Sequence, residues 1–115
     1  MKVIIAGGRD CWNAELVIKA IAASRFHIDE VVCGKAAGVD TLGERWAQWA
    51  GLPVAEFPAD WDQYGKAAGP IRNKQMAVYA DALIAVWDEK SRGTANMIKT
   101  MDSLGKPFYV LRYQG

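Results

Sequence analysis

Five short runs of apolar residues are spaced along the chain, and each is long enough to form a β-strand. Residues 2–6 read KVIIA and residues 82–87 read ALIAVW, and both runs are continuous in apolar side chains. Such runs are typical of strands that are covered on both faces, as in parallel sheets. Residues 30–33, 53–57 and 107–111 form the other three runs. The run at 53–57 is less apolar, which favours a place at an edge of the sheet.

Segments with apolar residues at helical spacing separate these runs. The first helix is expected to begin after Asn13, whose side chain suits an N-cap, and the second to end at Gly51. The third is expected to begin at Gly69-Pro70, because proline is well tolerated in the first helical turn. The fourth is expected to end at Gly105.

Strands that alternate with helices in this way predict an α/β fold, a Rossmann-like three-layer sandwich with a five-stranded parallel sheet. Right-handed crossovers leave few topologies. If the two most apolar strands are neighbours at the centre, the strand order is 3-2-1-4-5. Ligands bind at the carboxyl ends of the strands where such an order reverses, here between strands one and four. We expect residues 1–115 to form a single domain.

Composition then limits the function classes. The chain has 115 residues, of which 51% are hydrophobic, so it can bury a core. The net charge of +1 argues against strong nucleic-acid binding. No apolar run approaches the ~20 residues of a membrane span, and the N-terminus lacks a secretory signal, so no membrane association and a cytoplasmic location are expected. Cys11 and Cys33 are then expected to remain thiols, and with His27 alone no metal site is expected.

Residues 60–73, DWDQYGKAAGPIRN, show neither alternation nor a helical stripe until their end. Loops of this length in small domains are usually functional or disordered. The aromatic rings of Trp61 and Tyr64 argue against disorder and are candidates for base stacking. We therefore expect an ordered, ligand-facing loop that leads into the third helix. The free N–H groups at that helix start, beside Lys66 and Arg72, predict an anion site.

Polar or glycine-rich turns follow the strands, so they meet at one edge of the sheet. Half of the 14 Lys and Arg residues are expected there: Arg9, Lys35, Lys66, Arg72, Lys74, Lys90 and Arg92. The acids interleaved with them are Asp10, Asp40, Asp60, Asp62 and Asp88. Because cations suit phosphate and carboxylates suit ribose hydroxyls, with Asp40 or Asp60 as the ribose contact, the predicted ligand is a nucleotide.

Each turn also has a purely structural interpretation. Gly7 and Gly8 either make a tight turn or let a phosphate approach the backbone, and no third glycine completes a dinucleotide fingerprint. Gly34 and Gly38 carry the same two alternatives. Ser91 either caps the fourth helix or opens an anion site there.

These motifs together resemble the SLOG superfamily, and within it the YspA-type domain related to YpsA. The resemblance covers nearly the whole chain and is carried by Gly7-Gly8-Arg9-Asp10, Gly34, Gly38-Val39-Asp40-Thr41, PADW at 58–61, YGKAAGPIRN at 64–73 and Ser91-Arg92-Gly93-Thr94. It implies a Rossmann-like sheet with a pocket for nucleotides or for ligands such as ADP-ribose or NAD-like molecules. It also relates the chain to LOG phosphoribohydrolases, which cleave an N-glycosidic bond in nucleoside monophosphates, and to the DNA-binding DprA proteins.

One departure from LOG enzymes bears on catalysis. Their Pro-Gly-Gly-x-Gly-Thr-x-x-Glu motif ends in a glutamate, and Met97 stands at that position here. A methionine can neither activate water nor stabilise an oxocarbenium ion. In an enzyme, one of Asp10, Asp40, Asp60 or Asp88 would have to replace the glutamate, and the sequence does not choose among them.

The sequence therefore predicts a module that senses or sequesters a nucleotide-derived ligand, with no other cofactor. An N-glycoside hydrolase acting on a nucleotide is the alternative. Trp46 and Trp49 are expected in the core or in the interface of a homodimer, which is compatible with either function. The predicted ligand-binding residues are Gly7, Gly8, Arg9, Asp10, Gly34, Gly38, Val39, Asp40, Asp60, Tyr64, Lys66, Arg72, Asn73, Asp88, Ser91, Arg92, Gly93 and Thr94.

Overall fold

Five parallel strands form one sheet in the order β3-β2-β1-β4-β5, which confirms the predicted topology. The computed structural model describes residues 1–114. The strands are β1 (Lys2–Gly7), β2 (Glu30–Cys33), β3 (Val54–Glu56), β4 (Ala82–Trp87) and β5 (Phe108–Arg112). Central β1 pairs with β2 on one side and with β4 on the other. The order therefore reverses next to β1, and the switch point lies at its carboxyl end.

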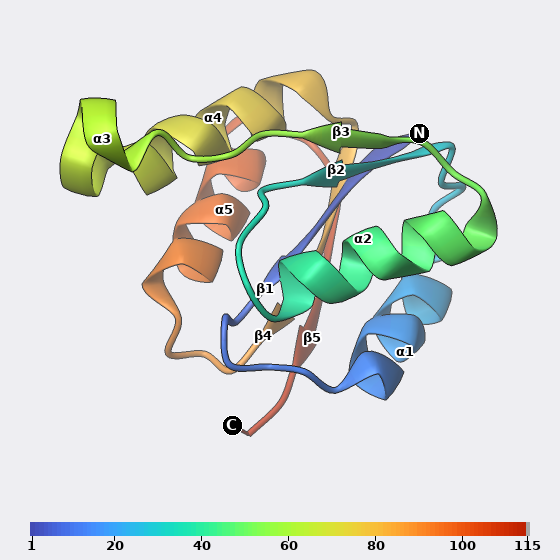
Figure 1. Ribbon diagram of the computed structural model, residues 1–115. Coiled ribbons are helices and arrows are strands. Elements are labelled where there is room, and N and C mark those ends of the chain that lie inside the picture. The colour runs from blue at the N-terminus through green and yellow to red at the C-terminus, as the bar shows by residue number, and fades with distance from the viewer. Residues whose placement is uncertain (115) are drawn as a thin grey trace.

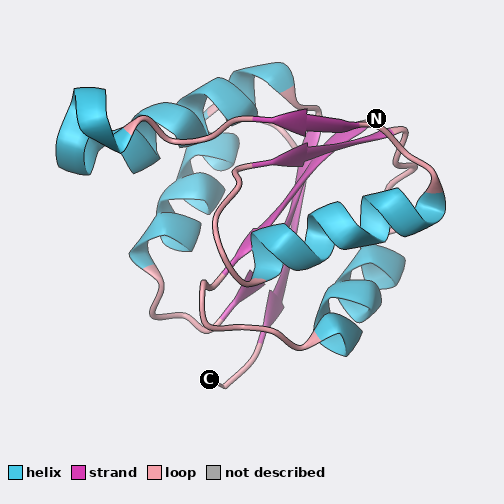
Figure 2. Cartoon of the chain, viewed as in Figure 1, coloured by secondary structure: helices cyan, strands magenta, loops and turns pink. Residues whose placement is uncertain are grey.

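Helices cover both faces of the sheet, as the three-layer prediction requires (Figures 1 and 2). One layer contains α1 (Ala14–Ser24) and α2 (Val39–Ala50), and the other contains α4 (Ala68–Tyr79) and α5 (Arg92–Ser103). Asn13 accepts a hydrogen bond from the N–H of Glu15 at 3.1 Å, so it is the N-cap of α1 that the sequence predicts.

The core consists of two clusters, one on each face of the sheet. Val3 and Ile5 of β1 pack toward α1 and α2, whereas Ile4 packs toward α4 and α5 with Met76 and Met97. Successive residues of a strand point to opposite faces, so both faces of β1 are buried. This explains its continuous apolar run, and each fully buried aliphatic side chain contributes about 1.5–3 kcal/mol.

The segment after β3 differs from its prediction. It is helical almost throughout: α3 (Trp61–Tyr64) is followed by a 3₁₀ turn, η1 (Gly65–Ala67), and α4 already begins at Ala68. The side chain of Asp60 accepts the N–H of Gln63 at 3.1 Å, and α3 ends at Gly65, whose φ is 55°. Since α3 buries no residue, its only sequence signals are this cap and this glycine, and no apolar stripe marks it.

The start of α4 also differs from the predicted anion site. The 3₁₀ turn runs directly into α4, and the N–H of Ala68 donates to the carbonyl of Gly65. The helix therefore begins one residue before the expected start at Gly69-Pro70, and its first N–H already has a backbone partner, whereas anion binding there stays a prediction.

The structure also tests the predictions for the two cysteines and for two of the tryptophans. Cys11 and Cys33 are buried free thiols, as predicted. Trp46 packs against the core, but Trp49 is 83% exposed, so its placement in the core is wrong and its role at an interface stays a prediction. None of the helices within residues 1–114 has the length and apolar character that crossing a bilayer requires.

Candidate functional site

A cavity of about 620 Å³ opens at the carboxyl ends of β1 and β4. This volume lies within the range of small-molecule sites, and its place is the switch point of the sheet. It brings together thirteen of the predicted ligand-binding residues: Gly7, Gly8, Arg9, Asp10, Asp40, Lys66, Arg72, Asn73, Asp88, Ser91, Arg92, Gly93 and Thr94.

The other five predicted residues lie outside this cavity. Gly34 lines a smaller adjoining cavity of about 330 Å³. Gly38 and Val39 form the start of α2 beneath the cavity lining, and Val39 is fully buried. Asp60 caps α3, and Tyr64 is an exposed residue of the same short helix. Neither of the latter two lines either cavity.

One side of the cavity, the packed wall, is lined by Gly7 and Gly8 and is backed by Gly38, which packs against Gly8 but does not line the cavity itself. A Cβ on Gly7 would lie 2.2 Å from the carbonyl oxygen of Val86, and a Cβ on Gly38 would lie 2.3 Å from that of Gly8. Gly38 also has a φ of 73°, which side chains disfavour. The N–H of Val39 donates to the Gly8 carbonyl at 3.2 Å. Close packing of backbones is thus a sufficient reason for glycine at these positions.

The opposite side, the open wall, consists of residues 91–94 at the N-terminus of α5. The Oγ of Ser91 caps the helix by accepting the N–H of Thr94 at 3.5 Å. A Cβ on Gly93 would meet nothing within 4 Å, so the backbone there is accessible from the cavity. A helix N-terminus carries partial positive charge and attracts anions.

Asp88 holds the loop before the open wall. Its Oδ1 accepts the backbone N–H groups of Lys90 at 2.9 Å and Ser91 at 2.8 Å. These hydrogen bonds, that of Ser91 first, hold the pKa of Asp88 below its usual value. The carboxylate is therefore already engaged in shaping the loop.

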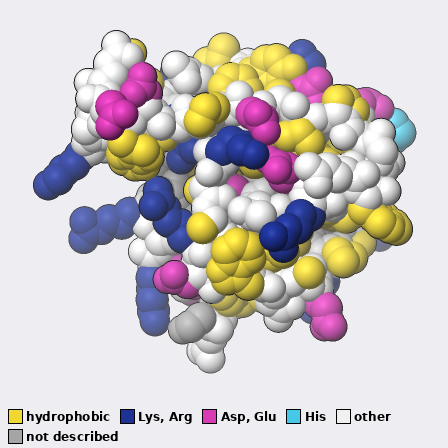
Figure 3. Space-filling view, viewed as in Figure 1, with side chains coloured by type: hydrophobic (Ala, Val, Ile, Leu, Met, Phe, Trp, Pro, Cys, Tyr) yellow, Lys and Arg dark blue, Asp and Glu magenta, His cyan; other side chains and the backbone are white. Residues whose placement is uncertain are grey.

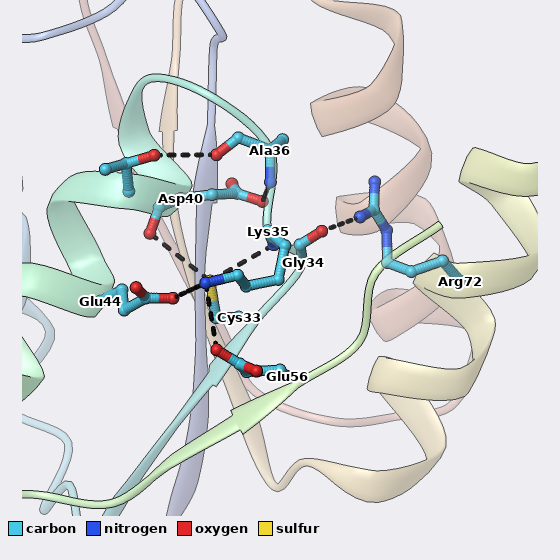
Figure 4. Close-up of polar contacts among 9 residues, drawn as sticks. Cys33, Gly34, Lys35, Ala36, Asp40, Glu44, Glu56 and Arg72 are labelled. Atoms are coloured by element: carbon cyan, nitrogen blue, oxygen red, sulfur yellow. Dashed lines mark hydrogen bonds and ion pairs between the residues drawn. The ribbon is translucent and has the colours of Figure 1, made fainter. Parts of the chain in front are cut away.

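Arg72 and Asn73 are neighbours on α4, hydrogen-bond to each other and connect the open wall to the turn after β2. Arg72 donates through Nη1 to the carbonyl of Gly34, as Figure 4 shows, and through Nε to Oδ1 of Asn73 at 3.1 Å. The buried amide of Asn73 in turn donates to the Gly93 carbonyl at 3.2 Å and to Oδ1 of Asn96 at 3.0 Å. The open wall is thus fixed to α4 and, through Arg72, to the turn after β2.

Asp40 is the buried carboxylate of the cavity. Its residue is only 5% exposed, and its Oδ2 accepts the N–H of Ala36 at 3.3 Å (Figure 4). Burial raises the pKa of Asp40 to about 6, although the Ala36 N–H and the guanidinium of Arg72 oppose the rise. A carboxyl group with this pKa changes its protonation state near neutral pH.

The cations of the edge fall into two groups. Lys35 is paired with Glu44 at 2.6 Å and with Glu56 at 3.0 Å, and Lys74 lines neither cavity. Five others line the larger cavity, and within residues 1–114 none of them forms an ion pair: Arg9, Lys66, Arg72, Lys90 and Arg92. Figure 3 shows Lys and Arg side chains gathered on the side of the molecule below α3. An almost neutral protein therefore has a locally positive cavity.

The cavity also contains residues that were not among the predicted ligand contacts. Trp61, suggested by the sequence only as a stacking ring, lines it with its indole 5.7 Å from the guanidinium of Arg9. Tyr113 follows the last strand, so the same edge rule could have found it, and burial raises its pKa to about 12. Asn96 has no such sequence signal, because only the packing of α4 against α5 brings it to Asn73.

The fold and the site together define a Rossmann-like α/β domain with a ligand-sized cavity at the switch point of its sheet. The chain belongs to the YspA, cpYpsA-related SLOG family, whose model matches residues 1–64, and this confirms the resemblance found in the sequence. The chain is 32% identical over 117 residues to the Gene 61 protein of Mycobacterium phage D29, with 92% of each of the two chains covered. No solved structure matches the chain.

Proposed function

We propose that this protein binds a nucleotide or a nucleotide-derived ligand, such as a nucleoside phosphate or an ADP-ribose- or NAD-like molecule, and acts as a sensor or sequestering module. Membership of the SLOG family indicates nucleotide-related ligand binding or processing. The observation that carries the proposal is a cavity lined by five cations, none of which forms an ion pair with another described residue. Such a cavity suits a ligand that carries negative charge.

The open wall is the proposed phosphate position. The first N–H groups of a helix have no partner within the helix. Ser91 accepts the N–H of Thr94, so the N–H groups of Arg92 and Gly93, which precede it at the start of α5, are the ones proposed to bind phosphate. The absence of a side chain at Gly93 lets a phosphate come close to them. Each charge-assisted hydrogen bond contributes roughly 1.5–3 kcal/mol, so three or four suffice for micromolar binding after the costs of association.

Trp61 is the proposed stacking surface for a base. Its side chain is half-exposed, lines both cavities and lies beside Arg9. An aromatic face that accepts a base contributes roughly 1–3 kcal/mol without requiring a particular base.

The binding test uses isothermal titration of the purified protein with AMP, GMP, ATP, GTP, NAD and ADP-ribose. Arg92→Ala and Arg72→Ala are expected to weaken the best ligand about tenfold or more. Lys99→Ala is the matched control, because it removes one exposed cation from α5 away from the cavity. Unchanged affinity in both arginine variants would reject the proposal.

Hydrolysis of an N-glycosidic bond is the second candidate. Met97 lines the cavity where LOG enzymes have glutamate, but Asp10, Asp40 and Asp88 line it too, whereas Asp60 does not. Chromatography of each nucleotide after incubation detects released base. If base is released, loss of product in one of the three alanine variants identifies the carboxylate. Release that persists in all of them would exclude a cavity aspartate.

A further inference from the structure

Asp40 differs from the other carboxylates of the cavity in how much of its hydrogen-bonding capacity is free. An ionised carboxylate has about four acceptor positions. Asp88 uses one oxygen for two backbone N–H groups, and Asp10 is exposed to water. Asp40 is almost fully buried, its Oδ2 accepts the N–H of Ala36 at 3.3 Å, and a hydrogen bond from the backbone of Gly7 also lowers its pKa. Within residues 1–114 no buried side-chain oxygen lacks a hydrogen-bond partner, so the acceptor positions that these N–H groups leave free face the cavity rather than the closed interior.

Burial of the Asp40 carboxylate is unfavourable by itself, but the surrounding residues hold it in place. Gly34 and Ala36 belong to the turn that places Asp40 in the first turn of α2, and Arg72 reaches the same point from α4. A Cβ on Gly34 would lie 2.8 Å from Oδ2 of Asp40 and 2.7 Å from Nη1 of Arg72. The turn therefore holds the carboxylate and the guanidinium on either side of a position that must remain free of a side chain.

We propose that Asp40 is the residue that recognises the sugar, by accepting hydrogen bonds from ribose hydroxyls, and that the cavity thereby selects ribonucleotides over 2′-deoxyribonucleotides. This inference rests on the proposed nucleotide-binding function. It makes Asp40, which lines the same cavity as the open wall, a residue that determines specificity.

The charged groups around Asp40 favour an uncharged hydrogen-bond donor of the ligand as its partner. Arg9 and Arg72 supply positive charge on two sides, so a cationic ligand group or a metal ion would be repelled. A hydroxyl donates a hydrogen bond without carrying charge. A ribose phosphate carries hydroxyls and an anion on one small framework, and Asp40 and the phosphate position at residues 91–94 line the same cavity.

The size of the expected selectivity follows from burial. When the ligand lacks the hydroxyl, the buried carboxylate stays unpaired, and water has little access to replace the donor. The ribonucleotide should therefore bind about tenfold or more tightly than its 2′-deoxy counterpart.

The test compares AMP with 2′-deoxy-AMP, and GMP with 2′-deoxy-GMP, by titration calorimetry. In the wild-type protein the ratio of the two dissociation constants should be about ten or more, and in Asp40→Asn it should fall to about three or less. Asparagine has the same shape and can still accept the Ala36 N–H. Asp102→Asn, which removes an exposed charge at the far end of α5, should keep the wild-type ratio.

The outcomes separate this inference from the function on which it rests. Equal affinity for ribo- and deoxyribonucleotides in the wild-type protein overturns the role of Asp40 but leaves nucleotide binding intact, and this result needs no variant. An unchanged ratio in Asp40→Asn overturns it as well. If none of the four nucleotides binds, the proposed function is rejected and the inference with it.

Discussion

The two walls of the cavity both contain glycine, but for opposite reasons. In the packed wall, Cβ atoms at Gly7 and Gly38 would overlap backbone oxygens at 2.2 and 2.3 Å. In the open wall, a Cβ at Gly93 would meet nothing within 4 Å. The first wall is therefore a rigid part of the fold, and the second is a surface that a ligand can approach. Identical residue types at the same edge of a sheet can thus serve folding on one side and access on the other.

Charged groups also differ between the packed wall and the open wall. The packed wall lies beside Asp40, whose carboxylate is buried between α2 and α4. The open wall carries the exposed cation Arg92 and the free end of a helix. Asymmetry of this kind suits a ligand with an anionic group at one end and neutral donors at the other. Substitutions on the two walls and on the residues near them test this contrast, and their expected effects on stability decrease from Gly7 to Gly93.

Gly7→Ala should have the largest effect. The new methyl group would collide with the carbonyl of Val86, which belongs to the neighbouring strand and cannot move without separating β1 from β4. We expect a loss of about 3 kcal/mol or more in the free energy of unfolding, or failure to fold. Urea denaturation followed by circular dichroism measures this. A loss below about 1 kcal/mol would show that the packed wall is not rigid.

Asn73→Ala should destabilise the protein by about 2 kcal/mol, because it removes both hydrogen bonds that its amide donates to α5, one of them to Gly93 of the open wall. The carbonyl of Gly93 and the side chain of Asn96 would lose their partner. Gln75→Ala, on the exposed side of the same helix, is the control and should change stability by less than about 0.5 kcal/mol. Equal effects of the two substitutions would mean that the network contributes nothing.

Asp40→Asn should stabilise the protein without ligand, by about 1–2 kcal/mol at pH 7. The pKa of Asp40 is raised from 3.8 to about 6, so between these pH values the folded state binds more protons than the unfolded state. Stability therefore falls as pH rises from about 4 to 6, and above pH 6 the buried charge is fully unfavourable. Besides Arg9 and Arg72, the backbone N–H groups of Ala36 and Gly7 lower the pKa of Asp40, and its charge in turn acts on the buried thiol of Cys33.

The measurement is the free energy of unfolding of both proteins at pH 4, 5, 6 and 7.5. The advantage of the variant should grow across this range. A constant difference between the two proteins would show that Asp40 does not titrate in this window.

Gly93→Ala should have the smallest effect on stability, less than about 0.5 kcal/mol, because the added methyl group meets no atom and alanine suits a helix. It should nevertheless weaken nucleotide binding several-fold, since the methyl group occupies space beside the free N–H groups. Denaturation and calorimetry on one sample separate the two effects. Destabilisation comparable to that of Gly7→Ala would remove the distinction between the walls.

The sequence alone was enough to predict the sheet, its strand order and the edge where polar turns gather. These features follow from local patterns: continuous apolar runs mark buried strands, and a parallel sheet places every following turn at one edge. The same reasoning missed α3, whose short helix buries nothing and leaves only a cap at Asp60 and a glycine at Gly65 as signals.

Only the tertiary structure decided what each residue at that edge does. It distinguished Gly7 from Gly93, buried Asp40 but left Asp60 as a helix cap, and joined Asn73 to Asn96 across two helices. The physical reason is that overlap, desolvation and hydrogen bonding depend on distances between segments far apart in the chain. A sequence pattern states which residues reach the edge, whereas the packing of the helices against the sheet determines which of them remain free for a ligand.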